Sequence, residues 1–422
     1  MQASRLNVLI SAYACSPSRG SEPGQGWNVA LQMARYHDVW LLTRANNRPA
    51  IEAALAQQHA CSFRCVYYDL PRWARWWKRG GRGIRLYYYL WQLGAWAVAR
   101  RLNRTIAFDV VHHVTFGRYW APSFVSLLSA PFVWGPVGGG ESTPRAFLQG
   151  MGARGRAYEA VRSAAQWVAE LDPFLRLTAR RSCRALATTP ETAMQLRRLG
   201  CRAVDVLGAV GVTEQDAAEL QRQPGVNHDA LRFLSIGRLL PWKGFHLGLQ
   251  AFARAEMSGA EFWIIGDGPD RRRLEALVQQ LGVAAQVRFL GVLPRTETLA
   301  RLGECRALVH PSLHDSGGWV CLEAMLAELP VLCLDHGGPA TLVTRDTGFL
   351  ANAQSPDLAV RDLAAAMAEL AHRPDRARAM GKAARARMLT EYPWSYKGEQ
   401  LDAVYRDVVA SANAAHHVPS QN

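Results

Sequence analysis

The chain has 422 residues, of which 49% are hydrophobic, 9% aromatic and 20% charged; this composition is that of a globular protein with two or three domains and excludes disordered, collagenous and coiled-coil chains. The net charge of +14 is unevenly divided, because residues 1–210 carry 27 Lys and Arg against 11 Asp and Glu, whereas residues 211–422 carry 22 against 24. An excess confined to the first half indicates that this half meets an anionic partner, such as a nucleic acid, a phospholipid or a phosphorylated substrate.

The first half alternates β-rich runs with helical stretches, which predicts a parallel sheet covered by helices on both faces. The expected strands are Leu6–Tyr13, Val39–Thr43, Phe63–Tyr68, Asp109–Thr115, Phe132–Trp134 and Arg184–Thr188. Between the first two, Trp27–Arg35 has the apolar spacing of one buried helical face. The glycines Gly24 and Gly26 precede this helix, and we expect a loop there in which the backbone can approach an anion closely.

Leu70–Phe108 contains nine basic residues and no acidic one, together with eight Trp and Tyr side chains. Basic residues interleaved with Trp and Tyr are typical of the headgroup level of an anionic bilayer, where each Lys or Arg contributes about 1 kcal/mol. The alternative is a solvated basic face over core aromatic residues. The chain has no apolar run of roughly 18–20 residues that could span a bilayer, and its amino end has no signal pattern. We therefore expect a cytoplasmic protein, docked peripherally on the inner face of the cell membrane.

Asp109–Thr115 is a predicted strand that ends in two histidines, His112 and His113. Because successive side chains of a strand point to opposite faces, at most one of them is expected to face a substrate. A second Gly-rich segment, Gly138–Glu141, follows the next strand and is a further candidate for a flexible loop that faces the cleft; a simple turn is a nearly equal alternative.

The alternation restarts in the second half, with expected strands at Leu231–Ile236, Ala260–Ile265, Val287–Leu290, Arg306–His310, Val331–Leu334 and Gly348–Leu350. We predict an α/β chain with two doubly wound, Rossmann-like domains that face a central cleft. The expected amino-terminal domain, residues 1–206, binds the acceptor. A connector without sustained periodicity, residues 207–230, leads to a nucleotide-sugar-binding domain, residues 231–390. Residues 391–422 are expected to form a helix that could cross back to the first domain, followed by a flexible tail.

Two segments of the second half contain charged residues that are candidates for ligand binding. After its first strand, Arg238 and Lys243 stand five residues apart on a Gly-bounded loop, a cation pair suited to a diphosphate. After the fourth strand, Pro311–Met325 predicts a Gly-containing loop and then a helix that starts near Trp319. Asp315 lies in that loop and Glu323 about one turn into the helix, a carboxylate pair placed to bind two hydroxyl-bearing groups.

These segments resemble the retaining glycosyltransferases of family 4, also called glycosyl transferases group 1, which have the GT-B fold. The hallmark of that family is two Glu residues with seven residues between them, and this chain has Asp315 in place of the first. It keeps the flanking Pro311-Ser312, Gly318, Glu323-Ala-Met325 and Leu329-Pro-Val331. The family's G-R-x-x-x-x-K-G motif matches Gly237–Gly244.

The resemblance implies transfer of a sugar from a nucleotide diphosphate to an acceptor hydroxyl, with retention of configuration. It assigns the donor diphosphate to Arg238 and Lys243, the ribose hydroxyls to Glu323, and the donor sugar to Asp315 with the N–H groups of Gly318 and Trp319. It further assigns phosphate or acceptor contact to Gly24 and Gly26. The resemblance places a His on the acceptor side of the site; it favours His112 for this role and does not exclude His113.

The expected partners are a nucleotide sugar, a glycan or lipid-diphosphate-linked glycan acceptor in cell-surface polysaccharide synthesis, and an anionic membrane surface. We expect no cofactor, no metal and no nucleic acid. A GT-B epimerase remains an alternative, as does a basic membrane- or nucleic-acid-binding protein without catalysis. A glycoside hydrolase would also use two carboxylates, but it needs no diphosphate-binding cations.

Overall fold

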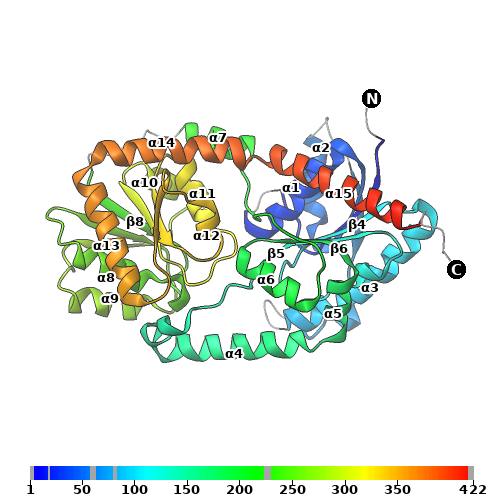
Figure 1. The fold of residues 1–422 in the computed structure, drawn as a ribbon, viewed down its shortest axis with the longest axis horizontal. Coiled ribbons are helices and arrows are strands. Elements are labelled where there is room, and N and C mark those ends of the chain that lie inside the picture. Colours follow the sequence, from blue (N-terminus) through cyan, green and yellow to red (C-terminus); the bar gives the residue numbers. More distant parts are fainter. Residues whose placement is uncertain (1–3, 18–19, 58–62, 79–82, 223–229, 417–422) are drawn as a thin grey trace. The chain divides into compact units, whose positions relative to one another are not determined.

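The computed structural model describes the chain except residues 1–3, 18–19, 58–62, 79–82, 223–229 and 417–422 (Figure 1). The chain forms two compact units. Unit 1 consists of residues 1–140, 165–209 and 394–422, and unit 2 of residues 141–164 and 210–393. Each unit contains one parallel sheet with helices packed against it, which confirms the predicted pair of Rossmann-like folds.

The sheet of unit 1 has seven strands in the order β3-β2-β1-β4-β5-β6-β7. Their bounds are β1 Asn7–Ala12, β2 Asp38–Arg44, β3 Arg64–Tyr68, β4 Val110–Thr115, β5 Phe132–Val137, β6 Ser182–Ala187 and β7 Val204–Val206. The central strands β4 and β5 are buried at every residue, as expected of a parallel sheet covered on both faces.

Helices cover this sheet on both faces. They are α1 Ser21–Tyr36, α2 Arg48–Gln57, α3 Ile84–Ile106, α5 Pro173–Arg181, α6 Pro190–Leu199 and α15 Trp394–His416, with the short 3-10 turns η1 Ala45–Asn47, η2 Arg72–Ala74 and η3 Phe124–Leu127. Residues of α3, α5 and α6 form one apolar cluster with Leu9, Val111 and Trp134 of the sheet. The helices α1 and α15 pack against each other and against β4.

Unit 2 has a six-stranded parallel sheet in the order β10-β9-β8-β11-β12-β13. The strands are β8 Arg232–Ile236, β9 Glu261–Ile265, β10 Val287–Gly291, β11 Ala307–His310, β12 Val331–Leu334 and β13 Gly348–Ala351. The helical segments are η4 Arg145–Phe147, η5 Gln149–Met151, α7 Glu214–Gln221, η6 Pro241–Lys243, α8 Phe245–Arg254, α9 Arg271–Gln280, α10 Arg295–Leu302, α11 Trp319–Leu326, α12 Gly337–Leu342, α13 Pro356–His372 and α14 Pro374–Glu391. The helix α4, Gly152–Glu170, runs from residues of unit 2 into residues of unit 1.

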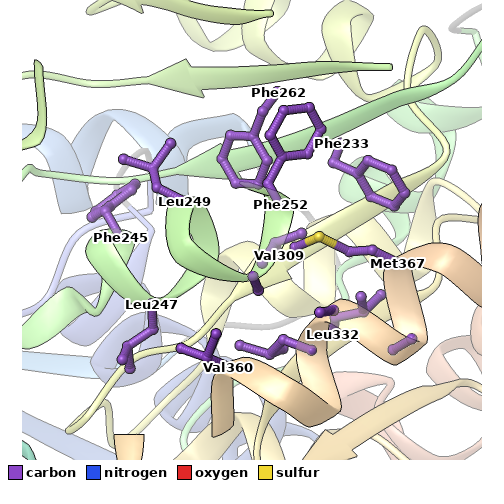
Figure 2. Close-up of a cluster of buried hydrophobic side chains, with 14 of the residues drawn as sticks. Phe233, Phe245, Leu247, Leu249, Phe252, Phe262, Val309, Leu332, Val360 and Met367 are labelled. Atoms are coloured by element: carbon purple, nitrogen blue, oxygen red, sulfur yellow. The ribbon is translucent and has the colours of Figure 1, made fainter. Parts of the chain in front are cut away.

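Two apolar clusters hold unit 2 together, one on each face of its sheet. Figure 2 shows the first, in which Phe233, Val309 and Leu332 of the strands meet Phe252 of α8 and Met367 of α13. The second is formed by residues of α10, α11 and α14 with the opposite side chains of the same strands. The ends of the strands are thereby fixed, and with them the loops that carry the candidate site.

The structure differs from the sequence-based expectation at three elements. The first helix begins at Ser21, so Gly24 and Gly26 lie within it rather than in a preceding loop. The expected connector contains the helix α7, and β7 is a further strand that the sequence pattern did not reveal. None of the described helices combines the length and the apolar character needed to cross a bilayer.

Candidate functional site

The candidate site lies at the carboxyl ends of β8 and β11 in unit 2. These two strands are neighbours in the sheet, and the chain leaves β8 for β9 on one side but β11 for β12 on the other. Such a switch point opens a crevice beyond the strand ends, where open α/β sheets bind ligands. The loops 237–244 and 311–318 start at these two ends.

The two loops are tied to each other by backbone contacts. The N–H of Leu313 donates to the carbonyl oxygen of Trp242 at 2.8 Å. Gly244 has φ +70°, and a Cβ there would lie 1.8 Å from the carbonyl oxygen of Pro311, so only glycine fits this position. The close approach brings Lys243 beside Asp315, although 72 residues separate them in the chain.

The carboxylate of Asp315 is held by four donors. Its Oδ2 accepts from the Lys243 ammonium at 2.6 Å and lies 3.2 Å from Nε2 of His310. Its Oδ1 accepts from the backbone N–H groups of Gly317 at 3.1 Å and Gly318 at 3.0 Å. The predicted residues Lys243 and Asp315 therefore lie together, with His310 as a third member that the sequence analysis did not identify.

The charges of this cluster shift its ionisation. Burial would raise the pKa of Asp315, but the Lys243 ammonium and the hydrogen bond from His310 outweigh it and hold the pKa well below its usual range. Burial lowers the pKa of His310, and the neighbouring Lys243 charge acts in the same direction, while Asp315 opposes both. At neutral pH the cluster thus contains an ammonium, a carboxylate and a neutral imidazole.

Glu323 lies about one turn into α11 and forms an ion pair with Arg295 of α10. The same guanidinium lies 3.3 Å from Oδ1 of Asp216 and 3.6 Å from Oε2 of Glu219, both on α7. Burial raises the pKa of Glu323, and Arg295 opposes this rise. One cation is thus shared by three carboxylates.

The other predicted donor-binding residues surround the same strand ends. Arg238 is exposed, and within the described part of the chain its guanidinium makes no hydrogen bond or ion pair. Gly318 caps α11 with φ +70°, and Trp319 is the first residue of that helix. The first N–H groups of a helix have no partner inside it, so this end of α11 favours an anion.

Residues 141–164 pack against both site loops. The ring of Trp242 is stacked between Tyr158, with ring centroids 4.0 Å apart, and His314, at 5.4 Å. Glu159 of α4 lies 2.9 Å from Nε2 of His314. The hydroxyl of Ser316 donates to the buried carboxylate of Glu141 at 2.8 Å, so Glu141 of the Gly-rich segment fixes the loop that carries Asp315.

His112 and His113 are fully buried in unit 1 and point to opposite faces of the sheet, as the period of a strand predicts. The two nitrogens of His112 lie 2.6 Å from the Tyr405 hydroxyl and 2.6 Å from the Gly135 carbonyl oxygen. His113 contacts the hydroxyl groups of Ser123 and Tyr88. These contacts give both rings a role in packing, and an acceptor-side role for either remains a prediction.

Gly24 and Gly26 serve the packing of α1 in this structure. Both are buried. A Cβ at Gly26 would lie 2.4 Å from the carbonyl oxygen of Ala14, so this glycine lets the helix approach the segment after β1. Neither glycine belongs to the connection between β1 and α1, because the helix has already begun at Ser21. Contact of these glycines with a phosphate or acceptor remains a prediction.

Sequence reasoning missed His310, Arg295 and Glu159, whereas Glu141 belongs to the Gly-rich segment that it identified. His310 ends a predicted strand of the switch point, and that position was the available signal for it. Arg295 contacts Glu323, and Glu159 contacts a site loop, from segments that carry no motif. Within the described residues, no group of three or more His, Cys, Asp or Glu side chains is placed to hold a metal ion.

Comparison with known proteins agrees with this geometry. Residues 216–387 match the family model described as Glycosyl transferases group 1. The chain is 30% identical over 261 residues to the 2-deoxystreptamine N-acetyl-D-glucosaminyltransferase of Streptomyces fradiae, a match covering 59% of this chain and 60% of that protein. It is 29% identical over 163 residues to the lipopolysaccharide core biosynthesis glycosyltransferase LpsD of Rhizobium meliloti, covering 38% and 46%. The chain thus spans about half the length of these curated relatives.

Solved structures are similar over nearly the whole chain. Sucrose-phosphate synthase from Thermosynechococcus elongatus superposes with a TM-score of 0.65 at 18% identity, covering 96% of this chain and all of that one. HepE of Anabaena in complex with UDP superposes with a TM-score of 0.61 at 18% identity, covering 95% and 100%. At these identities the comparison establishes the fold.

Proposed function

We propose that the chain, whose residues 216–387 match the Glycosyl transferases group 1 model and whose fold is GT-B, is a retaining, metal-independent glycosyltransferase of that family. Its donor is a nucleotide-diphosphate sugar. Its acceptor is a hydroxyl group of a glycan or lipid-diphosphate-linked glycan in the synthesis of a cell-surface polysaccharide. The LpsD relative in lipopolysaccharide core biosynthesis supports this class of acceptor.

The observation that carries the proposal is the charge arrangement at the switch point of unit 2. Two cations, Arg238 and Lys243, follow β8, and the amino end of α11 follows β11, next to it in the sheet. A diphosphate bound at these strand ends meets two positive side chains and helix N–H groups. The solved HepE structure in complex with UDP supports a nucleotide diphosphate as the ligand of this fold.

The chemistry follows from where charge develops. As the bond between the sugar and the diphosphate breaks, negative charge accumulates on the departing phosphate oxygens. Preorganised cations stabilise that charge in the transition state more than in the ground state, and each such interaction is worth about 3–4 kcal/mol. Arg238 and Lys243 supply this stabilisation, Glu323 binds the ribose hydroxyls, and the first N–H groups of α11, from Trp319 onward, face the donor.

A panel of sugar nucleotides identifies the donor. A ligand that binds the folded chain raises its free energy of unfolding, by about 2.7 kcal/mol when the ligand concentration is one hundred times the Kd. The unfolding temperature rises accordingly, and this rise is what the panel measures. With the donor identified, acceptor-dependent release of nucleotide diphosphate measures transfer, and the anomeric configuration of the product tests retention. Conversion of the sugar nucleotide without an acceptor would instead indicate an epimerase, and no stabilisation by any member of the panel would contradict the proposal.

Replacement of Lys243 tests the role of the cation pair. We expect Lys243→Ala to lower the turnover number by about 100- to 1,000-fold, the effect of removing one preorganised charge-stabilising donor. The exposed Lys382 of α14 is the control, because Lys382→Ala removes one positive charge outside the site. Near-normal activity of Lys243→Ala with an intact fold would overturn the assignment.

The membrane partner rests on the exposed side chains of unit 1. Trp73 is 78% exposed and Trp76 76%, and both lie among basic residues between β3 and α3. Three other aromatic residues of the basic segment, Tyr87, Tyr88 and Trp91, belong to the hydrophobic core, so they are core aromatic residues and not membrane contacts. The exposed side chains Leu86 and Leu93 of α3, together with Leu171 before α5 and Phe174 within it, add apolar surface to the same unit. Exposed Trp with basic neighbours fits an anionic membrane surface.

Flotation with vesicles tests this docking. We expect the chain to float with vesicles that contain anionic phosphatidylglycerol at low salt, and to float less at high salt because the attraction is screened. Trp73→Ser/Trp76→Ser should lose flotation, whereas Val292→Ser, which removes an equally exposed apolar side chain from unit 2, should not. Flotation of both variants to the same extent would exclude Trp73 and Trp76 as the docking residues.

A further inference from the structure

Asp315 leaves no acceptor position open for a sugar hydroxyl. A carboxylate offers about four lone-pair positions on its two oxygens. Here Oδ2 meets Lys243 and His310, and Oδ1 meets the N–H groups of Gly317 and Gly318. All four donors come from the protein, so the resemblance-based role of Asp315 as a ligand of the donor sugar does not fit its surroundings.

The environment of His310 explains how this arrangement is maintained. Its side chain is only 5% exposed, at the end of β11, compared with 18% for Asp315 and 23% for Lys243. A buried imidazole is neutral at neutral pH, and it can then donate through Nε2 to the carboxylate. The other groups that face the carboxylate are the Lys243 ammonium and two backbone N–H groups. The side chains of the cluster therefore fix one another.

The geometry points to a positioning role, and we propose that His310 and Asp315 form a pair that holds the Lys243 ammonium at the diphosphate position instead of binding the donor sugar. The inference rests on the proposed function, since it specifies how a group of that site is placed. Lys243 carries a flexible four-carbon stem, and ordering it before the ligand arrives lowers the entropic cost of binding.

The substitution of Asp for the family's usual Glu fits this role. Its shorter side chain lets one carboxylate receive Gly317 and Gly318 from its own loop and still reach Lys243 across from the β8 loop. The pair also compensates the charge of Lys243, whereas Arg238 is exposed and without an ion pair within the described residues. Arg238 is therefore the uncompensated cation that first attracts an anionic donor, and Lys243 is the fixed one.

A double-mutant cycle on UDP binding, measured by isothermal titration calorimetry, tests the pair. We expect Lys243→Met to weaken UDP binding by about 10- to 100-fold, as for loss of a hydrogen bond to a charged group, and His310→Leu by about 10-fold. The double variant should bind no more weakly than Lys243→Met, because His310 acts through Lys243. If the two losses add, His310 does not position Lys243 and the inference is wrong.

Conservative variants separate positioning from sugar binding. His310→Gln keeps an N–H donor of similar reach and should restore most of the affinity that His310→Leu loses. Asp315→Glu introduces the family's usual residue; we expect it to weaken UDP binding and lower turnover because the longer side chain displaces the Lys243 contact. Higher turnover of Asp315→Glu with an unchanged affinity for UDP would instead show that this carboxylate binds the sugar.

The outcome stays separable from that of the proposed function. If the wild-type chain bound no nucleotide diphosphate, the proposed function would fail. The pair would then be judged by the unfolding temperatures of His310→Leu, Asp315→Asn and their double variant, which should be non-additive if the side chains are coupled and additive if they are not. His372→Leu, at the end of α13, is the matched control and should change neither UDP affinity nor the coupling.

Discussion

At the scale of single residues, the shared cation Arg295 controls the ionisation and orientation of the Glu323 carboxylate. Glu323 is partly buried and pairs with Arg295, while Asp216 and Glu219 compete for the same guanidinium. Burial already raises the pKa of Glu323, and removal of Arg295 leaves this carboxylate without its counter-charge, so the pKa should rise further. A protonated or reoriented carboxyl group then accepts hydrogen bonds from ribose hydroxyls poorly.

We therefore expect Arg295→Ala to weaken binding of a ribonucleoside diphosphate by about 10-fold, comparable to loss of one charged hydrogen bond. The same variant should bind the 2′,3′-dideoxy analogue about as well as the wild type does, because that ligand offers no hydroxyl to Glu323. Calorimetric titration of both ligands measures the difference.

Arg301→Ala is the control, since Arg301 lies on the same helix and pairs with Glu297 and Glu304 instead. Equal weakening of both ligands by Arg295→Ala would show that Arg295 acts on the nucleotide elsewhere than through the ribose.

Single residues also show what the sequence could predict. Sequence motifs singled out Lys243 and Asp315 as candidate site residues, and both lie in loops that follow the ends of predicted strands. Their direct ion pair was not predictable, because it depends on the close packing of two loops through Gly244. His112 and His113 were predicted to face opposite ways and do so, but the sequence held no sign that Tyr405, almost 300 residues later, would contact His112.

At the scale of elements, sequence patterns identified buried strands best. The six strands expected in unit 2 are present within one or two residues of their predicted bounds, because each is a short apolar run between turns. The helix α7 was missed because it buries little apart from Leu220; its signal was the capping box of Thr213 and Asp216, which is local and polar. In α1, Gly26 was expected in a loop, but it lies where the helix approaches Ala14, and this close contact is what requires a glycine.

The loop before α8 gives a prediction at this scale. Gly244→Ala places a Cβ 1.8 Å from the Pro311 carbonyl oxygen and keeps φ at +70°. We expect unit 2 to lose about 1–2 kcal/mol for the left-handed backbone and about 1–3 kcal/mol more for the overlap. The displaced loops should also separate Lys243 from Asp315, so UDP binding should weaken. Urea unfolding and calorimetry measure the two effects.

Gly259→Ala is a matched control for this prediction. Gly259 has a similar φ of +72°, but nothing lies within 4 Å of an added Cβ. This variant should therefore lose only the backbone contribution of about 1–2 kcal/mol and retain UDP binding. Equal losses of stability in the two variants would mean that the contact with Pro311 does not constrain the loop.

At the scale of the whole molecule, buried histidines set the response to acid. Burial lowers the pKa of His112 to about 4, of His113 to about 3 and of His246 to about 4. In the unfolded chain their pKa is about 6.5, so the unfolded state binds more protons below that pH. The free energy of unfolding should therefore be unaffected by these rings above about pH 6.5 and fall between about pH 6.5 and 4.

Each such ring contributes a slope of up to about 1.4 kcal/mol per pH unit in that window. His113→Gln keeps a polar group beside Ser123 and removes one titrating ring, so the slope of stability against pH should become shallower. His372→Gln, on the surface of unit 2, should leave the slope as it is. Denaturant titrations between pH 4 and 7 provide the measurement, and an unchanged slope in His113→Gln would show that this ring does not titrate on unfolding.

The two-sheet architecture of the whole molecule was predictable because the strand and helix alternation restarts after residue 230. The assignment of residues 141–164 to unit 2 was not. It depends on long-range contacts such as the stacking of Tyr158 on Trp242 and the hydrogen bond between Ser316 and Glu141, which leave no periodic trace in the sequence.

The return of α15 to unit 1 has a consequence for how the chain is made. Leu401, Tyr405 and Val408 are buried, and α15 packs on α1, which begins at residue 21. A ribosome delivers the first sheet early, but the helix that covers this face is synthesised only after the whole of the second sheet. The apolar surface of the nascent first unit that α15 buries is therefore without its cover while unit 2 is synthesised.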